Sequence, residues 1–491
     1  MSRGLKFYFL LILLSIKLNV YSQQDNTLFF MHDLPQANFV NPAVPSTCKL
    51  FIGFPALSSI SANYSNTALS LRDALVQKGD SLYWDLDKIA SKIRGKELIT
   101  SDLDVTLFTM GIHVDDYYFT FSVNERATSY NMVRAEALKL AWYGNTRYLG
   151  EQAEVSGTRV NANNFHEFAF GASKNLNERF RLGLRAKFLF GLGNVYTPKT
   201  SGFLFTDKTS FAMNLLMNSN VNSSLPVDVT VDDEGKVTDI QLKDDASYKN
   251  YFLNFHNFGV GFDLGFVFQK DDKTRISGSL LDFGGIFWNK DLNTFVSDGK
   301  IFYPGTTENS GFDDPDYVQI IIDSLENIFI PEVDPSGFMS PLVPKIYLGV
   351  TRDLTEHINA GVLVRSEIYR NRLHPSLTLS ANTFNFKVFN ASVSYTVQNG
   401  EFTNIGAGIG VKAGPVQLHL ISDNIPGFFM LDNTRNVNIR FGLSFIPGCD
   451  EKVKPASKPS SRGGGYSKGI RPLPCSYSPY KTQKSKKRRR K

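Results

Sequence analysis

The feature that most constrains this chain is a strict alternation of apolar and polar residues over unusually long runs. Between residues 179 and 190 the two parities read Phe180, Leu182, Leu184, Ala186, Phe188 and Phe190 against Arg179, Arg181, Gly183, Arg185 and Lys187. Residues 258–268, 358–368, 389–397 and 405–411 alternate in the same way. A period of two predicts β-strands that have one apolar and one polar face.

The length of these runs separates two classes of β protein. Four of the five runs last 9 to 12 residues, whereas strands of soluble domains are typically about 5 to 6 residues long. A tilted strand needs about 9 to 11 residues to cross a bilayer. The polar faces are rich in Gly, Ser and Asn, which suits a crowded or hydrated lumen. We therefore expect an all-β fold, a transmembrane antiparallel β-barrel; the alternative is a large secreted β-sandwich.

The first residues predict where the chain goes. Arg3 and Lys6 precede an apolar run from residue 7 to 16. Residues 20–22, just before Gln23, are small or are tolerated at a signal-peptide cleavage site. This is the layout of a cleaved signal peptide, and its apolar run is too short for a membrane-spanning helix. Because no Cys stands at the expected cleavage point, the pattern does not favour a lipoprotein anchor.

Turn residues predict the orientation of the barrel. Short hairpins are expected at 115–116, 175–178, 271–273, 383–385 and 413–414, between longer connections at 66–102, 222–254 and 289–344. Outer-membrane barrels have short periplasmic turns and long external loops, so the long insertions should face outward. Helical spacing of apolar residues after Gly79 (Leu82, Leu86, Ile89, Ile93) and after Asp314-Pro315 predicts a short amphipathic helix in each of two insertions. We expect these helices to pack on their own insertion rather than bind a partner.

The chain ends in a segment of different composition. Residues 447–491 contain 14 Lys or Arg and 2 acidic residues, and seven of the last eight residues are basic: Lys484, Lys486, Lys487, Arg488, Arg489, Arg490 and Lys491. Such a composition predicts a disordered tail. The expected domains are thus a signal peptide at 1–22, an N-terminal periplasmic segment at 23–48, the barrel at 49–446 and a basic periplasmic tail at 447–491.

Several local motifs carry a family resemblance. Gln36 to Ala43 contains an Asn-Pro-Ala motif, and the later motifs lie at 256–265, 281–284, 422–424 and 438–445, with Trp288 between them. The chain resembles a Bacteroidota family of outer-membrane proteins of unknown function, related to the fatty-acid transporter FadL and to the PorV and PorP/SprF components of type IX secretion. The resemblance implies a FadL-like barrel of about 14 strands in the outer membrane. Weak segments at 138–154 and 201–221 leave the count open up to 18. Unlike in a true fatty-acid transporter, no long plug follows the Asn-Pro-Ala motif.

Chemical motifs are sparse. The seven His residues stand singly, without local nucleophilic or acidic partners, and no acidic cluster completes a Ca²⁺ loop. We predict no enzyme activity, no cofactor and no metal. The run Gly406 to Gly410 lacks the strand–turn–helix context of a phosphate loop and reads as barrel wall. Arg179, Arg181, Arg185 and Lys187 form a cationic stripe, which we expect to pair with acidic residues such as Asp263 across the barrel; the alternative is a lumen that attracts anions.

Three cysteines raise the question of a disulfide. A closed barrel pairs its first strand with its last. Cys48 stands just before the first expected strand, and Cys449 follows the last one closely. We predict a Cys48–Cys449 disulfide, and a Cys449–Cys475 bond or no bond remain alternatives.

These features favour a non-enzymatic outer-membrane protein. The leading hypothesis is a subunit or anchor of an envelope assembly for protein secretion or outer-membrane protein insertion. Its partners would be outer-membrane lipid, proteins of that machinery and, at the tail, an acidic periplasmic protein or the cell wall. The signal peptide argues against nucleic acid as a partner of the basic tail. The alternative is a FadL-like conduit for a hydrophobic small molecule.

Overall fold

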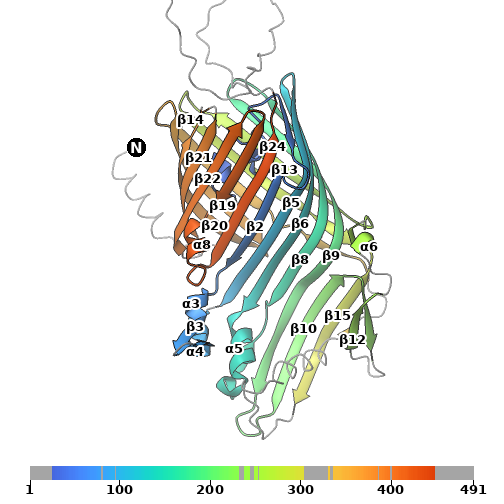
Figure 1. The fold of residues 1–491 in the computed structure, drawn as a ribbon. Helices are drawn as coiled ribbons and strands as arrows, with labels where there is room; N and C mark the ends of the chain where they lie inside the picture. Colours follow the sequence, from blue (N-terminus) through green and yellow to red (C-terminus); the bar gives the residue numbers. More distant parts are fainter. Residues whose placement is uncertain are drawn as a thin grey trace, which may run out of the picture.

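Fourteen antiparallel strands close into a β-barrel (Figure 1). The computed structural model describes residues 25–447 apart from 79–80, 94, 232–236, 244–247, 253, 304–329, 332–335, 385, 387 and 399–400. The first wall strand consists of β1 (Leu50–Gly53) and β2 (Ser59–Asn66). The others are β5 (Lys96–Val114), β6 (Tyr117–Arg134), β8 (Arg159–Asn175), β9 (Phe180–Thr206), β13 (Asn257–Gln269), β14 (Thr274–Trp288), β18 (Lys345–Asp353), β19 (Ile358–Tyr369), β20 (Arg372–Thr383), β21 (Phe389–Gln398), β22 (Glu401–Ala413), β23 (Val416–Ser422) and β24 (Asn436–Phe445).

The barrel closes where its first strand meets its last. Ile52 of β1 pairs with Phe445 of β24, and β2 continues the same pairing at Ile60 and Phe441. The other edge of β1 and β2 pairs with β5. Because every wall strand thus has two neighbours, the wall has no open edge to expose its backbone groups.

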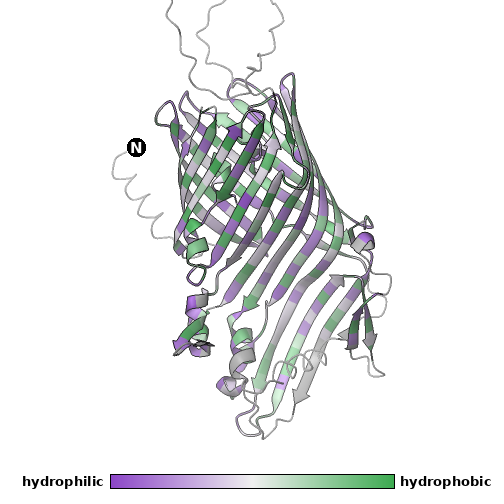
Figure 2. Ribbon diagram, viewed as in Figure 1, coloured by the Kyte–Doolittle hydropathy of each residue, from purple (hydrophilic) through white to green (hydrophobic). Residues whose placement is uncertain are grey.

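The period-two pattern decides which face of the wall is which. On β19, Val362 and Val364 are 45% and 48% exposed on the outer face, whereas the alternating residues Leu363 and Arg365 are fully buried. The other strands alternate in the same way between exposed and buried residues. Figure 2 shows the matching alternation of hydrophobic and hydrophilic residues along the strands. This is the arrangement of an outer-membrane barrel, whose apolar side chains face lipid and whose polar ones face the lumen.

The two ends of the barrel differ. Short turns close one end, and at the other end β9 runs on for 27 residues in all and pairs with β10 (Met213–Ser224). β10 in turn pairs with β15 (Leu292–Tyr303), so a sheet extends well beyond the barrel on one side (Figure 1). Smaller strands complete the fold: β3 (Leu75–Lys78), β4 (Ser81–Trp84), β7 (Gln152–Glu154), β11 (Val227–Val231), β12 (Val237–Leu242), β16 (Ile330–Pro331) and β17 (Phe338–Pro341).

Helices are short and lie outside the wall strands. They are η1 (Leu28–Phe30), α2 (Ala37–Val40), α3 (Leu71–Ala74), α4 (Leu86–Lys92), α5 (Ala135–Tyr143), η2 (Thr146–Tyr148), α6 (Tyr248–Phe252) and α8 (Ile425–Phe429). Within the described residues, none is long and apolar enough to span a bilayer.

The first insertion differs in part from the helix expected there. Leu82 lies in β4, and the helix begins only at Leu86, after the side chain of Asp85 caps it by accepting from the Lys88 amide. Ile89 and Ile93 pack against Ala74 and Ala135. Ile89 and Ile93, the second half of the predicted stripe, are therefore buried within the insertion and its neighbours, as predicted. The second expected helix, after Asp314, lies outside the described residues.

The two weak segments do not add wall strands. Leu138 belongs to α5, residues 201–206 are the end of β9, and 213–221 belong to β10 in the extension. The count of 14 is thereby confirmed.

Candidate functional site

The lumen contains the chain's own N-terminal segment. Residues 25–48 lie inside the barrel and we call them the plug. Its apolar side chains form one buried cluster with the inner wall: Leu28, Phe29, Phe30, Met31, Leu34, Ala37, Val40, Ala43 and Val44 with Val267, Leu281, Tyr347, Leu363 and Ile421. The expectation of a periplasmic segment at 23–48 needs correction over residues 25–48, because these apolar residues leave water only if the segment enters the barrel.

Glycines on the inner wall make room for the plug. A Cβ built on Gly408 would lie 2.4 Å from the sulfur of Met31, and one on Gly410 would lie 2.6 Å from Leu34. On β9, a Cβ at Gly183 would lie 2.3 Å from the carbonyl carbon of Pro42. The alternating glycines of 406–410 thus face inward as contact points for the plug, which confirms the interpretation of this run as barrel wall.

Polar contacts fix the start of the plug. The carboxylate of Asp25 forms a two-bond ion pair with Arg440 of β24, at 2.7 and 2.8 Å. The amides of Asn26 and Thr27 donate to the carboxylate of Asp423 at 3.1 and 2.7 Å. These two sites tie the start of the plug to the last part of the barrel.

The Asn-Pro-Ala motif forms a turn near the end of the plug. Asn41 accepts from the Ala43 amide at 2.9 Å and donates to the carbonyl of Phe266 on β13 at 3.2 Å. Asn38 holds the far side of the turn by donating to the carbonyl oxygens of Pro42 and Val44. The motif therefore locks the turn onto the wall.

A buried network of charges fills the lumen beside the plug. The ammonium of Lys187 lies 2.9 Å from Asp263, 2.6 Å from Asp282 and 3.5 Å from Glu167. Arg126 donates to Glu167 and makes two bonds to Asp282, at 2.8, 2.9 and 3.1 Å. These side chains are almost fully buried, so each charge is stabilised by its partners rather than by water.

An irregularity in the wall builds this network. The β13–β14 register shifts at Asp263, and Asp282 adopts a left-handed backbone with φ of 59°. Leu281 and Asp282 consequently both face inward, one onto the plug and one into the network. A non-Gly residue in this conformation is strained, and such strain persists where surrounding contacts enforce it.

The predicted cationic stripe is divided among three places. Arg185 pairs with Asp263 at 3.1 Å and also donates to Asn38 of the plug. Asp263 lies directly beside Arg185 on the neighbouring strand, not across the barrel, because the pair occupies one register position of β9 and β13. Arg181 lies nearer the short-turn end, where its Nε donates to Ser173 at 3.4 Å. Arg179 lies before β9 in the hairpin and is not part of the inner wall.

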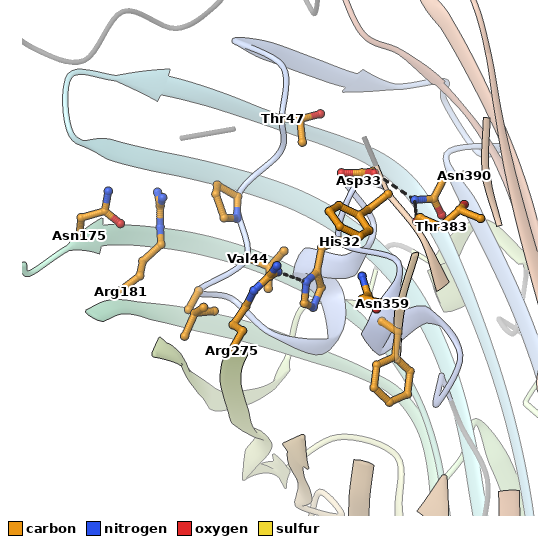
Figure 3. A pocket seen from close by; sticks show the side chains of 15 residues that line it. His32, Asp33, Val44, Thr47, Asn175, Arg181, Arg275, Asn359, Thr383 and Asn390 are labelled. Carbon is orange, nitrogen blue, oxygen red and sulfur yellow. Dashed lines mark hydrogen bonds between the residues drawn. The ribbon is translucent and has the colours of Figure 1, made fainter. Parts of the chain in front are cut away.

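A pocket of about 70 Å³ opens at the short-turn end between the plug and the wall (Figure 3). Arg275 donates to Nδ1 of His32 at 2.5 Å, and Asp33 accepts from Asn390 at 3.2 Å. Burial, together with the positive charge of Arg275, lowers the pKa of His32 to about 3. His32 is therefore neutral, and its Nδ1 can accept a hydrogen bond from the guanidinium of Arg275. We call this cavity the mouth pocket.

A larger groove of about 400 Å³ lies on the wall where β5, β6, β8 and β9 run side by side. Small residues form its floor, namely Ser101, Ala127, Ser129, Ala162 and Gly193. Leu225 and Tyr251 border it, and Tyr251 donates to the outward-facing Asn164 at 2.9 Å. The neighbouring His166 pairs with Glu125 and donates to the carbonyl of Phe252. The α6 segment thus shields polar side chains on a wall face that otherwise faces lipid.

Cys48 is disulfide-bonded. It lies just before β1, and its side chain packs with Phe51 and Ile446. The chain three residues before Cys449 is therefore beside Cys48. Because Cys449 and Cys475 lie outside the described residues, the identity of the partner stays a prediction. The basic tail residues from Lys484 to Lys491 also lie outside them.

The plug and most of the charge network were not expected from the sequence. Arg126, Glu167 and Lys345, whose ammonium lies 3.6 Å from Asp282, were not singled out, although the first two lie on the polar parity of their strands. Asp282 was noted only as part of the motif at 281–284. Parity alone identifies inward positions but not which of them meet. Closely spaced inward glycines were the available signal for the plug. Their missing side chains leave space on the inner wall that another segment must fill.

Several known proteins are similar to this chain. A family model described as a family of unknown function (DUF5723) matches residues 42–423. Among curated proteins, none matches the sequence. Solved structures with similarity include the toluene transporter TbuX of Ralstonia pickettii, at 8% identity and a TM-score of 0.38, covering 84% of this chain and 94% of that one. A Pseudomonas aeruginosa FadL homologue has 10% identity and a TM-score of 0.36, covering 87% and 99%. The translocator domain of the autotransporter NalP from Neisseria meningitidis has 6% identity and a TM-score of 0.30, covering 81% and 88%.

Proposed function

The chain belongs to the DUF5723 family, and we propose that it is a plugged outer-membrane platform that holds an envelope assembly in place. The observation that carries this proposal is the filled lumen. The plug occupies one end of the barrel, and beside it acids and bases pair closely around a cavity of about 70 Å³. Ligand pockets typically have volumes of roughly 300–1,000 Å³, so this cavity is too small to bind or conduct a ligand-sized molecule.

Charge pairing makes the closed lumen the stable state. Opening a path past Lys187 would separate it from three carboxylates within 3.5 Å. Removing one partner from a buried ion pair costs about 3–5 kcal/mol. Spontaneous opening is therefore rare, which suits a structural role better than steady conduction.

The parts outside the barrel supply surfaces for partners. The sheet of β9, β10 and β15 projects beyond the wall on one side, next to α3, α4 and α5 (Figure 1). In this proposal the projecting sheet faces outward and contacts a neighbouring protein. The basic tail at 447–491 extends into the periplasm and recruits a secretion or outer-membrane insertion component by charge.

Two measurements test the platform. Purification from gently solubilised membranes, followed by mass spectrometry, should recover a stoichiometric protein partner that an unrelated barrel from the same membranes does not recover. In planar bilayers the purified full-length protein should show no steady ionic conductance. A lone barrel that conducts would contradict the proposal.

A second function is favoured by one specific observation, the groove on β5, β6, β8 and β9. Its lining is mostly apolar and its volume of about 400 Å³ is sufficient for a small hydrophobic molecule. In that case the protein would be a conduit, and uptake of a fluorescent apolar probe by proteoliposomes would detect it. Ala162→Trp fills the groove and should abolish uptake, whereas Ala172→Trp, at an outward position of the same strand, should not.

A further inference from the structure

The end of the barrel opposite the mouth pocket carries a group of positive charges. Four wall strands, β5, β6, β8 and β20, each have a basic residue as their terminal residue at this long-loop end. These residues are Lys96, Arg134, Arg159 and Arg372. Each lies two residues from a buried side chain that faces the lumen: Leu98, Met132, Asn161 and His374, respectively. Because side chains two apart share one face of a strand, all four cations point toward the barrel axis. We call them the basic rim.

The hairpin between β19 and β20 brings one rim residue to the others across the lumen. The ring of Tyr369 lies 5.4 Å from that of Tyr130 on β6, and the Tyr369 hydroxyl donates to the Tyr130 carbonyl at 3.1 Å. In the turn, Arg370 donates to the carbonyl of Thr197 on β9 at 2.5 Å. Arg372 is the register partner of Tyr369. These contacts place Arg372 beside the cations of β5, β6 and β8.

An apolar cluster lies directly below the basic rim. It consists of five side chains that are each at most 8% exposed, namely Leu98, Tyr130, Met132, Val343 and Tyr369. The cluster separates the rim from the buried charge network deeper in the lumen. The carboxylates of that network are therefore not available to neutralise the rim.

Most of the rim charges have no acidic partner among the described residues. Arg134 pairs with both nearby carboxylates, those of Glu136 and Glu154. Within the described part of the chain, Arg159 has no ion pair, and its buried Nε has no hydrogen-bond partner. With Arg370 included, five basic side chains face two carboxylates, so three positive charges are uncompensated.

The rim charges also repel one another. Lys96 stands directly opposite Arg134 in the β5–β6 register, and like charges in this position destabilise a sheet. Lys96 lies beyond the membrane-spanning part of β5, since the strand has 19 residues and about 9 to 11 cross a bilayer. Burial and the positive charges of Arg372, Arg134 and Arg159 lower the pKa of Lys96. An anion bound between these side chains would relieve the repulsion.

The chemistry of the rim favours a phosphate ester. A guanidinium binds phosphate through two parallel hydrogen bonds. A phosphate monoester carries about −1.5 to −2 charges and three acceptor oxygens, whereas a carboxylate carries one charge and would leave more of the rim uncompensated. Because the rim points toward the barrel axis and away from lipid, its ligand arrives from solution and not from a lipid headgroup.

We propose that the basic rim binds the phosphate group of a soluble organic phosphate. Arg159 and Arg372 donate to the phosphate oxygens from two sides of the lumen, and Lys96 adds a third positive charge. Arg134 and Arg370 keep their own partners and strengthen the positive potential. The inference goes beyond the platform function and does not require it. It also uses none of the residues that line the groove on β5, β6, β8 and β9.

Fluorescence anisotropy of the full-length protein in detergent tests this directly. The probe is a fluorescently labelled neutral disaccharide that carries one phosphate monoester, and the same disaccharide without phosphate is the control. The phosphorylated form should bind at least about tenfold more tightly, the effect expected of hydrogen bonds to a charged group. Its affinity should fall as salt is raised. The basic tail is the same in every variant, so its attraction for the probe cancels when variants are compared.

Substitutions separate the rim from general charge effects. Arg159→Gln and Arg372→Gln should each weaken binding of the phosphorylated probe by about tenfold, and Arg159→Lys should retain part of the affinity because it keeps the charge. Arg147→Gln is the matched control, since Arg147 is an exposed arginine of η2 that pairs with Asp87. It should change little.

Thermal unfolding provides a second readout that does not depend on the label. The unlabelled phosphorylated disaccharide should raise the unfolding temperature of the parent protein, because a ligand that binds only the folded state stabilises it. It should not do so for Arg372→Gln. Arg372 is exposed, so its replacement should leave the fold intact, and circular dichroism checks this.

Three outcomes contradict the proposal. Equal binding of the phosphorylated and unmodified disaccharides would show that the phosphate is not recognised. A loss of affinity in Arg147→Gln as large as that in Arg159→Gln would show that only net charge matters. Short-chain phosphatidic acid that binds more tightly than the sugar phosphate, and loses this affinity in Arg159→Gln, would show that the rim takes a lipid headgroup. Each outcome is independent of whether the barrel conducts or co-purifies with a partner.

Discussion

A single added methyl group should loosen the plug. At Gly183 of β9, a Cβ would lie 2.3 Å from the Pro42 carbonyl carbon and 2.4 Å from the Ala43 amide nitrogen. Ordinary van der Waals contact begins at about 3.4 Å, so the plug backbone must move by about 1 Å. Because backbone cannot turn aside as a flexible side chain can, Gly183→Ala should cost about 1–3 kcal/mol of plug stability, the range for overpacking a filled interior.

Gly261 provides the matched control. It also faces inward, on the adjacent strand β13, but its nearest atoms lie 3.5 Å from a built Cβ. Gly261→Ala should therefore be tolerated. Both variants add one methyl group on the inner face of the wall. Only the methyl group at position 183 meets Pro42 of the plug.

Hydrogen exchange with mass spectrometry measures the difference. Local opening free energy determines the exchange rate of protected amides, so a loss of about 1–3 kcal/mol should speed exchange in peptides covering residues 25–48 by about 5- to 150-fold. Wall peptides should exchange as in the parent protein. Equal exchange of the plug in Gly183→Ala and Gly261→Ala would refute the argument that the wall glycines hold the plug by close contact.

Three further outcomes are expected. Non-reducing peptide mapping should recover a linked pair of peptides containing Cys48 and Cys449, because the first and last strands meet beside Ile446; a Cys48–Cys475 pair would show that the tail folds back instead. Lys187→Met should destabilise the barrel by about 3–5 kcal/mol in denaturant unfolding, since it leaves buried carboxylates without their ammonium, whereas Lys199→Met, at an exposed position of the same strand, should have little effect. Deletion of residues 463–491 should leave the circular dichroism spectrum unchanged and weaken a salt-sensitive association; a truncated protein that keeps every partner at the same salt concentration would show that the tail does not recruit.

The sequence predicted the wall well because the wall obeys a local rule. Each strand shows its own alternation, and lipid outside enforces it at every outward position, as at Val362 and Val364. The short turns were predictable for the same reason, since residues such as Gly414 and Asp115, with φ of 59° and 50°, adopt conformations characteristic of tight turns.

The interior was harder to predict because its contacts join distant parts of the chain. Asp282 reaches Arg126 only because a register shift turns two successive residues of β14 inward. Arg185 and Asp263 were both identified from sequence, but their distance depends on the register between β9 and β13. The alternation of apolar and polar residues shows which face a residue occupies, but it does not show how two strands are aligned with each other. The position of the plug also depends on where five strands, β9, β13, β18, β19 and β22, bring their glycines, and this becomes known only when the barrel is closed.

The attachment of the plug has a consequence for how the molecule assembles. Asp25 bonds to Arg440, 415 residues later, and Thr27 bonds to Asp423, 396 residues later. Contacts between residues so far apart form late, because the loop between them must first lose its freedom. The part of the chain that is synthesised first must therefore wait for the part that is synthesised last. A closed barrel leaves no wide entrance for the plug. The last strand, β24, should therefore pair with β1 and β2 around a plug that is already in place. During biogenesis, enclosure of the plug and closure of the barrel should then occur in the same step.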